Sequence, residues 1–353
     1  MSRLLAQPDG GLTYAQAGVS IAAGDEFVQR IKDVVASTSR PGVLGGIGGF
    51  GGMFHLAAGR YRDPVLVSSA DGVGTKLEVA RQMGRYDTVG LDLVAMLVDD
   101  LVCAGAEPLF MLDYVAVGRL DPERLSVLIA GIAEGCRQCS TALLGGETAE
   151  HAAVLGEHGL DVAGFAVGVV ERGRELGAHR VKKGDALVGL GSPGLRSNGY
   201  TLARRVLVGS DEDLHRPAYD GASRSLGDEL LVPSVIYAPA VMAVAQAIGT
   251  GLHAVAHITG GGITGNVARV LPGACDALIH MDAFETPEIF FEIQRRGAVS
   301  AEEMVRVFNC GLGMVVVVDA DDVDDAVNAA THVGITATVV GHARPGSGQV
   351  VLT

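Results

Sequence analysis

Apolar residues recur along this chain in two kinds of run. Short runs rich in valine and leucine predict strands, and longer runs with apolar positions every three or four residues predict helices. Strands and helices mixed in this way indicate an α/β or α+β fold. The expected strands are Val65–Ser69, Pro108–Val117, Asp161–Val170, Ala186–Leu190, Asp276–Ile279, Gly313–Val318 and Ala337–His342. The expected helices are Gly24–Thr38, Thr88–Gly105, Asp121–Thr141, Gly199–Val208, Pro239–Ala247, Gly265–Val270, Ser300–Phe308 and Asp321–Val333.

The length of the chain and one charged connection predict two domains. At 353 residues the chain is long enough for two units of ~150 residues, each with its own core. A polar, charge-rich stretch runs from Glu171 to Asp185. We place the boundary near residue 175, which gives an N-terminal domain at 1–175 and a C-terminal domain at 176–353.

The charge balance and the lengths of the apolar runs exclude some classes of partner. The net charge is −14, and no basic tract is present that would neutralise a nucleic-acid backbone. Leu91–Val98 and Met314–Val318 are far shorter than the ~20 apolar residues of a membrane span. Met1–Gly10 has no signal-peptide pattern, so we expect a cytoplasmic protein. Small phosphorylated ligands remain compatible with an acidic chain, through backbone amides and Mg²⁺.

Five cysteines include one pair, Cys136 and Cys139, with C-x-x-C spacing. Elsewhere this spacing is typical of redox or zinc sites. Here the pair lies in an expected helix, with no second C-x-x-C and no neighbouring histidine pair. We therefore interpret both residues as ordinary packed thiols.

The sequence DGVGTK at 71–76 directly follows the apolar run that predicts the first strand. It places the carboxylate of Asp71, the hydroxyl of Thr75 and the ammonium of Lys76 at the mouth of a strand. Such groups suit a polyphosphate bound through a metal ion, and the glycines allow the backbone to approach it closely. The order of residues is not that of a Walker A loop. Alone, the motif is equally typical of a β-turn with an exposed lysine.

Further acids occur in strongly apolar surroundings. Asp92 and Asp99 are seven residues apart and share one face of the expected helix, with Asp100 beside them. Carboxylates in such a helix need a cation or donors, and few basic residues lie nearby in the sequence, so a metal ion is a simple partner. A solvated polar stripe is the alternative. Glu147 repeats the pattern of Asp71, because it follows an apolar run and two glycines.

Two glycine-rich segments could bind phosphate through backbone amides. Residues 45–52 read GGIGGFGG, and residues 259–266 read TGGGITGN just after His257 and before an expected helix. Either segment could instead be a mobile linker. A third turn, Leu195–Tyr200, also opens a helix and offers Ser197 as a cap or ligand contact.

The motifs DGVGTK, GAEPLF, GGETAE, SNGY and FNCGLGM follow one another from residue 71 to residue 314. In this order they resemble the AIR synthetase family of phosphoribosylformylglycinamidine cyclo-ligases. Its wider superfamily includes selenophosphate synthetase, thiamine-monophosphate kinase, a hydrogenase-maturation protein and FGAM synthetase. The resemblance implies a two-domain fold of the AIR-synthetase type: an N-terminal sheet domain that forms the core of a homodimer, and a C-terminal α/β domain.

The resemblance also implies the chemistry. Formylglycinamidine ribonucleotide (FGAM) and ATP would give aminoimidazole ribonucleotide (AIR), ADP and phosphate, with Mg²⁺, in de novo purine synthesis. Carried onto this chain, it implies Asp71, Asp99, Asp100 and Glu147 as the metal site, and Asp71, Lys76 and His257 as catalytic residues. It implies ATP contacts from Gly48, Gly49, Gly51, Thr75, Lys76 and Asn198. The Gly260–Gly262 loop and Asn309 would face the same cleft.

The chain departs from the family pattern at two charged positions. Many members have Val-Asn-Asp where this chain has Val98-Asp99-Asp100, and many have histidine at the position of Arg196. We interpret Arg196 as a phosphate clamp, because a guanidinium cannot act as a base; the alternative is a solvent-facing side chain. A kinase-like relative and a non-catalytic nucleotide-binding dimer are competing hypotheses. The retained acids and Lys76 argue against the second.

Overall fold

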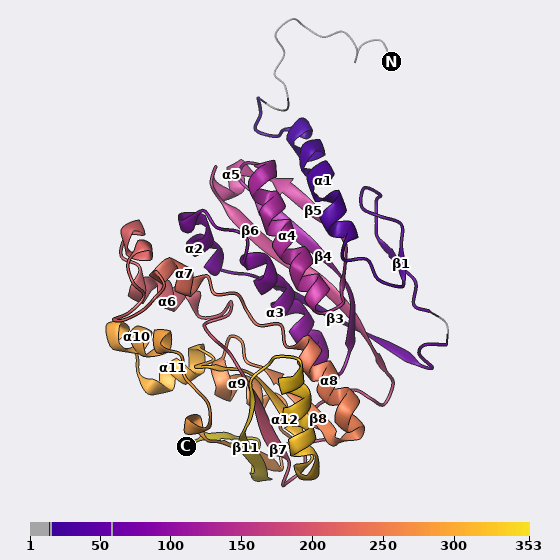
Figure 1. Ribbon diagram of the computed structural model, residues 1–353, viewed down its shortest axis with the longest axis vertical. Helices are drawn as coiled ribbons and strands as arrows, with labels where there is room; N and C mark the ends of the chain where they lie inside the picture. The colour runs from indigo at the N-terminus through magenta and orange to yellow at the C-terminus, as the bar shows by residue number, and fades with distance from the viewer. Residues whose placement is uncertain (1–13, 15, 58) are drawn as a thin grey trace, which may run out of the picture.

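Two β-sheets organise the chain, and Figure 1 shows them one above the other. The computed structural model describes residues 14, 16–57 and 59–353. The first sheet has the order β3-β6-β4-β5 and the second the order β12-β9-β11-β7-β10-β8. The first comprises β3 (Pro64–Gly72), β4 (Glu107–Val117), β5 (Ala142–Glu150) and β6 (Leu160–Glu171). The second comprises β7 (Ala186–Gly191), β8 (Leu252–His257), β9 (Cys275–Ile279), β10 (Leu312–Val318), β11 (Ala337–Pro345) and β12 (Val350–Leu352).

Helices cover one face of the first sheet (Figure 1). They are α1 (Ile21–Ala36), α3 (Val89–Cys103) and α4 (Pro122–Gln138). Apart from Leu91 and Asp100, every residue of α3 up to Val102 is buried, because the helix packs on β3 and β6 and also on β8 and α8 of the second domain. Helix α3 therefore carries its acids into the contact between the two domains. Shorter elements nearby are β1 (Val43–Leu44), β2 (Met53–Phe54), α2 (Lys76–Met83) and α5 (Ala152–Leu155).

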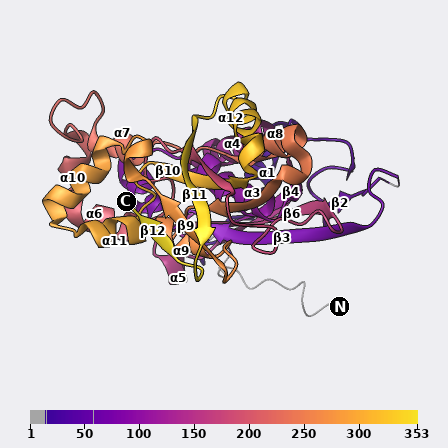
Figure 2. The same ribbon diagram turned by 90° about the horizontal axis from the view of Figure 1, so that it is seen from below.

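The second sheet is covered by α8 (Ala238–Ile248) and α12 (Val323–His332), which lie on the same side of it in Figure 2. Its β10 strand is fully buried between β7 and β8, which explains its uninterrupted valine run. The other helices of this domain are α6 (Tyr200–Leu207), α7 (Leu226–Leu230), α9 (Gly262–Ala268), α10 (Glu288–Gly297) and α11 (Ala301–Val307). Short 3₁₀ helices lie at Asp211–His215, Gly249–Gly251, Met281–Ala283 and Ala320–Asp322.

Local capping fixes where several helices begin or end. The Ser20 hydroxyl accepts a hydrogen bond from the Ala23 amide at the start of α1. The Asp121 carboxylate accepts one from the Arg124 amide, with Pro122 in the first turn of α4 as the sequence predicts. Gly84 ends α2 in the left-handed region, at φ 64°.

The mixed α/β fold class predicted from the sequence is confirmed. Strand β6 of the first sheet ends at Glu171 and β7 of the second begins at Ala186, so we keep the division near residue 175 as a proposal. Among the described residues no helix is long and apolar enough to cross a membrane. The expectation about Met1–Gly10 lies outside the described residues.

Candidate active site

One of the predicted acids, Asp100, contacts His257 where the first domain meets the second. Asp100 on α3 lies 2.8 Å from His257, measured from Oδ1 to Nδ1, and 3.4 Å from the Ser69 hydroxyl on β3. Asp71, near the end of β3, interacts electrostatically with both Asp100 and His257. Burial, helped by the Asp100 carboxylate, raises the pKa of Asp71 against the hydrogen bond from the Gly72 amide. Burial also opposes ionisation of Asp100, but His257, Arg269 and Ser69 together outweigh it and hold the pKa of Asp100 below its usual value.

The donor set of Asp71 and Asp100 fits a magnesium ion. Mg²⁺ in phosphate-transfer sites is commonly held by one or two carboxylates together with the substrate phosphates. Two neighbouring carboxylates repel each other, and a divalent cation between them would remove that repulsion. Across residues 14, 16–57 and 59–353, however, no three His, Cys, Asp or Glu side chains come together as a complete protein metal site.

Glu147 does not join these two acids. It lies on β5 opposite Tyr114 of β4, and it is exposed. Four paired residues form one row across the sheet: Asp71 on β3, Gly164 on β6, Asp113 on β4 and Gly146 on β5. Because successive side chains of a strand point to opposite faces, Glu147 leaves the sheet on the other side from this row.

Asp99 occupies a different environment from its neighbour Asp100. Its Oδ1 accepts hydrogen bonds from the Tyr237 and Ala238 amides at 2.8 and 2.9 Å, where α8 begins. Its Oδ2 lies 2.7 Å from Nη2 of Arg196, and the side chain is fully buried. These contacts favour a structural role for Asp99 over the predicted metal binding, because both of its oxygens already have protein partners.

Arg196 is neither a phosphate clamp nor a surface residue. Its side chain is 1% exposed, and its guanidinium stacks on the Tyr237 ring at 4.6 Å. Besides Asp99, it donates hydrogen bonds to the carbonyls of Gly313 and Val235, each at 3.1 Å. The two charged departures from the family pattern are therefore partners in one buried ion pair, which joins α3 to the second domain.

Lys76 has a similar position, and the prediction that it contacts phosphate does not fit it. Its side chain is 0% exposed, and Nζ lies 2.7 Å from Oδ2 of Asp92. The ammonium also donates to the carbonyls of Arg196 and Val232, at 3.1 and 2.7 Å. Asp92 in turn accepts hydrogen bonds from the amide and hydroxyl of Ser234. Lys76 is thus bound to the other domain and faces away from solvent.

His257 is also buried, with a side chain 3% exposed. Its Nδ1 meets Asp100, and its Nε2 faces Asp99 at 3.9 Å. A catalytic contact between this ring and a ligand therefore does not fit the structure. The histidine instead orients the Asp100 carboxylate.

Thr75 and Asn198 lie at the exposed mouth between the domains. The Thr75 hydroxyl is 3.1 Å from the hydroxyl of Thr201 on α6. Asn198 Oδ1 accepts a hydrogen bond from the Gly260 amide, which ties the SNGY turn to the TGGG turn. Asn309, by contrast, is buried and holds the backbone at Gly194 and Gly311.

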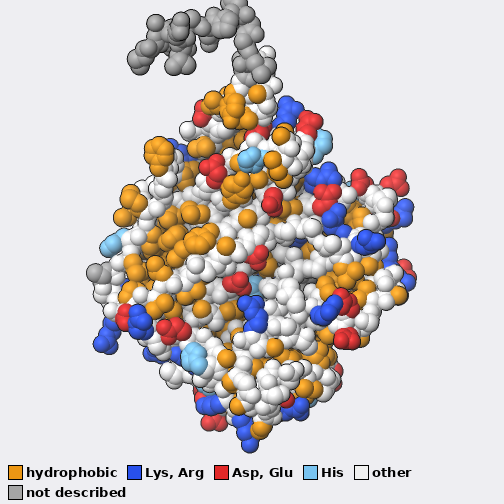
Figure 3. All heavy atoms as spheres, turned by 180° about the vertical axis from the view of Figure 1, so that it is seen from behind, with side chains coloured by type: hydrophobic (Ala, Val, Ile, Leu, Met, Phe, Trp, Pro, Cys, Tyr) orange, Lys and Arg blue, Asp and Glu red, His pale blue; other side chains and the backbone are white. Residues whose placement is uncertain are grey.

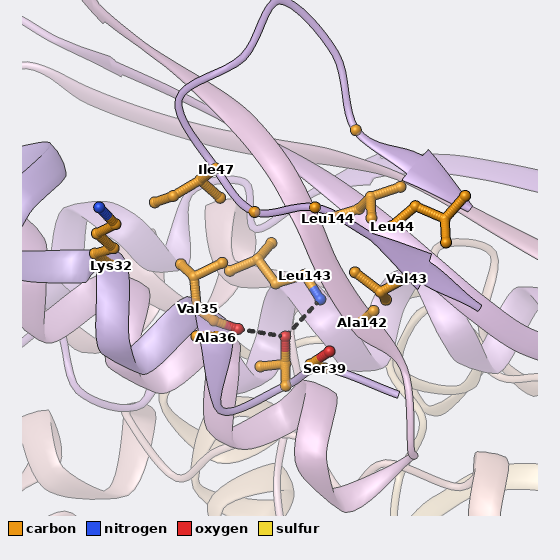
Figure 4. Close-up of a pocket in the computed structure, with 14 residues that line it drawn as sticks. Lys32, Val35, Ala36, Ser39, Val43, Leu44, Ile47, Ala142, Leu143 and Leu144 are labelled. Carbon is orange, nitrogen blue, oxygen red and sulfur yellow. Dashed lines mark hydrogen bonds between the residues drawn. The ribbon is translucent and has the colours of Figure 1, made fainter. Parts of the chain in front are cut away.

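The glycine-rich loop lies over β4 and β5, away from Asp71. Gly48, Gly49 and Gly51 line a cavity of about 320 Å³ together with Asp113 and Gly146. At Gly48 the backbone has φ +106°, and an added Cβ would meet no atom within 4 Å. Figure 4 shows the neighbouring pocket, in which Ile47 of this loop faces Val35 of α1, and Lys32 lies at the rim.

Comparison with known proteins identifies the family. Residues 57–170 match the N-terminal domain, and residues 182–352 the C-terminal domain, of AIR synthase related proteins. The phosphoribosylformylglycinamidine cyclo-ligase of Myxococcus xanthus is 48% identical over 339 residues, covering 96% of this chain and 98% of that protein. The same enzyme of Trichlorobacter lovleyi is 47% identical over 332 residues, covering 94% and 95%. The chain belongs to the phosphoribosylformylglycinamidine cyclo-ligase family.

Solved structures share the fold of this family at low sequence identity. Thiamine-monophosphate kinase from Stenotrophomonas maltophilia aligns with a TM-score of 0.63 at 18% identity, covering 92% of this chain and 95% of that one. A hydrogenase maturation protein, HypE, crystallised in complex with ATP, has a TM-score of 0.63 at 14% identity, covering 98% and 92%. The predicted AIR-synthetase-type fold is confirmed.

The cysteine pair of this cyclo-ligase-family chain is packed in α4 and the turn that follows it. Cys136 is buried, and Cys139 donates from Sγ to the carbonyl of Gly135 and the hydroxyl of Thr141. Burial raises the pKa of Cys139 to about 12, so its thiol stays protonated. Nothing in this geometry resembles a redox or zinc site.

Sequence reasoning about the cyclo-ligase motifs missed one polar residue, Asp113. It follows Leu112 in the expected strand Pro108–Val117 and is 8% exposed on the face covered by helices. Strand alternation is the signal that could have found it, because Met111 and Val115 on the same face are apolar and fully buried.

Proposed function

We propose that this chain converts FGAM to AIR in an ATP-dependent cyclisation that releases ADP and phosphate, as a step of purine synthesis in the cytoplasm. The observation that carries the proposal is the 46–48% identity, over nearly the whole length, to three relatives named phosphoribosylformylglycinamidine cyclo-ligase. Binding of ATP is supported by HypE, which shares the fold and was crystallised with ATP.

The proposed reaction has two bond changes at the formyl carbon. The formyl oxygen of FGAM takes the terminal phosphoryl group of ATP, which leaves ADP. The amidine nitrogen then attacks the formyl carbon and loses a proton, while the carbon–oxygen bond breaks and inorganic phosphate departs with that oxygen. Phosphorylation thus turns a poor leaving group into a good one.

Residues at the domain contact would handle the phosphates. Asp71 and Asp100 would hold Mg²⁺, which when bound neutralises charge on the phosphate oxygens. His257 would act through Asp100, because it fixes that carboxylate with a 2.8 Å hydrogen bond. The Thr75 hydroxyl, exposed at the same mouth, would donate to a phosphate oxygen.

The glycine-rich loop would bind the nucleotide through backbone amides. Gly48, Gly49 and Gly51 carry no side chain between their amides and the cavity that they line. We retain Asn198 as a residue that shapes the neighbouring turn, through its hydrogen bond from Gly260.

We further propose that two copies of the chain associate through the uncovered face of the first sheet. Figure 3 looks toward this side of the molecule and shows hydrophobic side chains gathered on it. Leu66, Tyr114 and Phe165 are 64%, 42% and 42% exposed there, and Phe165 is in register with Ala70 and Leu112. Large exposed apolar patches mark interaction surfaces, and a second identical face is the complementary partner that a two-fold dimer provides.

The test of the function is a product assay with purified protein, FGAM, ATP and Mg²⁺. Formation of AIR and of equal amounts of ADP and phosphate, all dependent on FGAM, is the expected result. ATP alone and FGAM alone are the controls. ADP release that does not respond to FGAM, or that responds equally to other small acceptors, would contradict the proposal.

A further inference from the structure

Arg196 combines a buried charge with an uncommon backbone conformation. Its φ is 64°, which lies in the left-handed region. A residue with a side chain is disfavoured there, because its Cβ approaches the following carbonyl oxygen. Arg196 directly precedes the SNGY turn, residues 197–200, from which α6 begins. The chain can enter that turn in this way only if other contacts hold residue 196 in place.

The side chain of Arg196 supplies those contacts. Its guanidinium donates to the Asp99 carboxylate on α3 and to the carbonyls of Gly313 and Val235, and it stacks on the Tyr237 ring. Its Nε has no hydrogen-bond partner among the described residues. A buried ion pair is often no more stabilising than apolar residues of the same volume. Stability alone therefore does not explain why a buried ion pair and a strained backbone occur together here.

The backbone of Arg196 connects the SNGY turn to the DGVGTK turn. Its carbonyl accepts a hydrogen bond from Nζ of Lys76 at 3.1 Å. Lys76 directly follows Thr75, whose hydroxyl lies 3.1 Å from the hydroxyl of Thr201 on α6. Because φ and ψ are the two soft dihedrals of a residue, they set the direction of this carbonyl. A change in the conformation of Arg196 would therefore separate the two turns.

The SNGY turn continues this connection through Asn198. Its Nδ2 lies 3.5 Å from Sδ of Met96 on α3, and its Oδ1 accepts the Gly260 amide at 3.1 Å. The side chain of Asn198 thus joins α3 to the TGGG turn of the second domain. Its position depends on the direction in which the chain leaves Arg196, two residues earlier.

We propose that Arg196 is a positioning residue: its ion pair with Asp99 holds a left-handed backbone, and this backbone fixes the SNGY turn between the DGVGTK and TGGG turns. The inference rests on the proposed function, in which the substrates bind at the mouth that these turns form. Arg196 itself is 1% exposed and acts through its neighbours. A displacement of about 1 Å far from the reacting atoms can lower the rate by about 100-fold.

Two double variants separate backbone positioning from packing. Both carry Asp99→Asn, which removes the buried negative charge. The asparagine variant adds Arg196→Asn, and the methionine variant adds Arg196→Met. Asparagine adopts the left-handed region far more readily than methionine. Methionine is closer to arginine in size and packs well on an aromatic ring such as that of Tyr237, whereas asparagine leaves a cavity. The two roles therefore predict opposite orders of activity.

Steady-state kinetics with FGAM and ATP is the first measurement. The asparagine variant should keep most of the wild-type kcat/KM for FGAM, and the methionine variant should lose about 10- to 100-fold. The methionine variant should nevertheless unfold at the higher urea concentration. Equal activity of the two variants, or higher activity in the methionine variant, would overturn the inference.

Hydrogen exchange at the Gly260 amide is a second measurement that needs no activity. This amide donates to Asn198, so it should exchange faster in the methionine variant and at the wild-type rate in the asparagine variant. Asp99→Asn alone keeps Arg196 but weakens its ion pair, and it should also speed exchange at Gly260. It is the variant to use if neither double variant folds, and an unchanged exchange rate in it would overturn the inference.

Gly334→Met is the control for strain elsewhere. Gly334 has φ +87° and open surroundings in the second domain, so methionine there should lower the melting temperature. Its kcat/KM for FGAM and its exchange at Gly260 should stay at the wild-type values. Faster exchange at Gly260 in Gly334→Met would mean that any loss of stability loosens the turn, which would also overturn the inference.

The two measurements distinguish this inference from the proposed function. Exchange at Gly260 that differs between the two double variants as expected, in a protein that makes no AIR, would overturn the function alone. A wild-type protein that makes AIR, with both double variants equally active, would overturn the inference alone.

Discussion

At the scale of single residues, the positions of the charged groups decide what each can do. Asp99 and Asp100 are neighbours on α3, yet one is sealed in an ion pair with Arg196 and the other meets His257 near Asp71. Their sequence context is nearly identical, so composition alone could not separate them. Their partners come from 97 and 157 residues away, and only the fold brings those partners close.

The same reasoning explains why a metal seemed the simplest partner for the acids of α3. The sequence near them offers few basic residues, but Lys76 reaches Asp92 from the next helix and Arg196 reaches Asp99 from the other domain. Lys76, the cation of the DGVGTK motif, therefore has a structural role. The prediction for Asp71 and Asp100 stays open to test.

Asp71→Asn and Asp100→Asn should each lower kcat/KM by about 100-fold or more. Mutation of a residue that only hydrogen-bonds a metal ligand costs up to about 100-fold in activity, and loss of a ligand itself should cost at least as much. Each amide keeps the shape of the acid and removes a charged oxygen ligand. The measurement is activity as a function of Mg²⁺ concentration, with circular dichroism as the control for folding. Unchanged Mg²⁺ dependence in both variants would rule out this pair as the metal site.

Arg196→Gln should destabilise the protein by about 3–5 kcal/mol, because it leaves the Asp99 carboxylate buried and unpaired. The double variant Asp99→Asn with Arg196→Gln should recover most of that loss, since the carbonyl oxygen of the introduced asparagine can still accept the two amides of α8. Urea unfolding measures the free energy of unfolding of both variants. A double variant as unstable as Arg196→Gln alone would show that the unpaired Asp99 carboxylate does not cause the loss of stability.

At the scale of elements, apolar periodicity predicted most of the secondary structure. Strands such as β10 and β4 and helices such as α3 and α4 lie where their runs of apolar residues place them. The sequence did not predict β5, because Gly145, Gly146 and Glu147 resemble a turn. It lies paired along its length with β4, which compensates for the low strand preference of glycine. Tertiary pairing of this kind is not encoded locally.

Gly48→Val should weaken ATP binding more than a matched glycine substitution elsewhere. The backbone there has φ +106°, which costs a β-branched residue about 1–3 kcal/mol, and the added side chain would extend into the loop cavity. Gly184→Val is the matched control, because Gly184 has φ +94°, equally open surroundings and a place in the second domain. Both variants should lose similar melting temperature, and only Gly48→Val should bind ATP more weakly. Equal ATP affinity in the two would make the loop purely structural.

At the scale of the whole molecule, helix α3 joins two domains whose facing turns form the candidate site. Its buried acids bind Lys76 and Arg196. Lys76 directly follows Thr75, and Arg196 lies just before the turn that carries Asn198. The end-to-end order of motifs was enough to predict this two-domain fold. Which motif residues face the ligand depends on how the domains meet, and that was not readable from the sequence.

Phe165→Glu should convert the proposed dimer to monomers, because it places a charge at the centre of the uncovered sheet face. Light scattering after size exclusion should give half the wild-type mass. Val339→Lys, at an exposed valine of the second sheet, should keep the wild-type mass. A Phe165→Glu protein that is folded and still dimeric would place the interface elsewhere.

The fate of the formyl oxygen of FGAM tests the proposed reaction most directly. The purified protein is given ATP, Mg²⁺ and FGAM labelled with ¹⁸O in the formyl group, and the products are analysed by mass spectrometry. We expect one AIR, one ADP and one inorganic phosphate for each FGAM consumed, with a single ¹⁸O atom in that phosphate. Phosphate without the label, or no AIR at all, would contradict the proposed reaction.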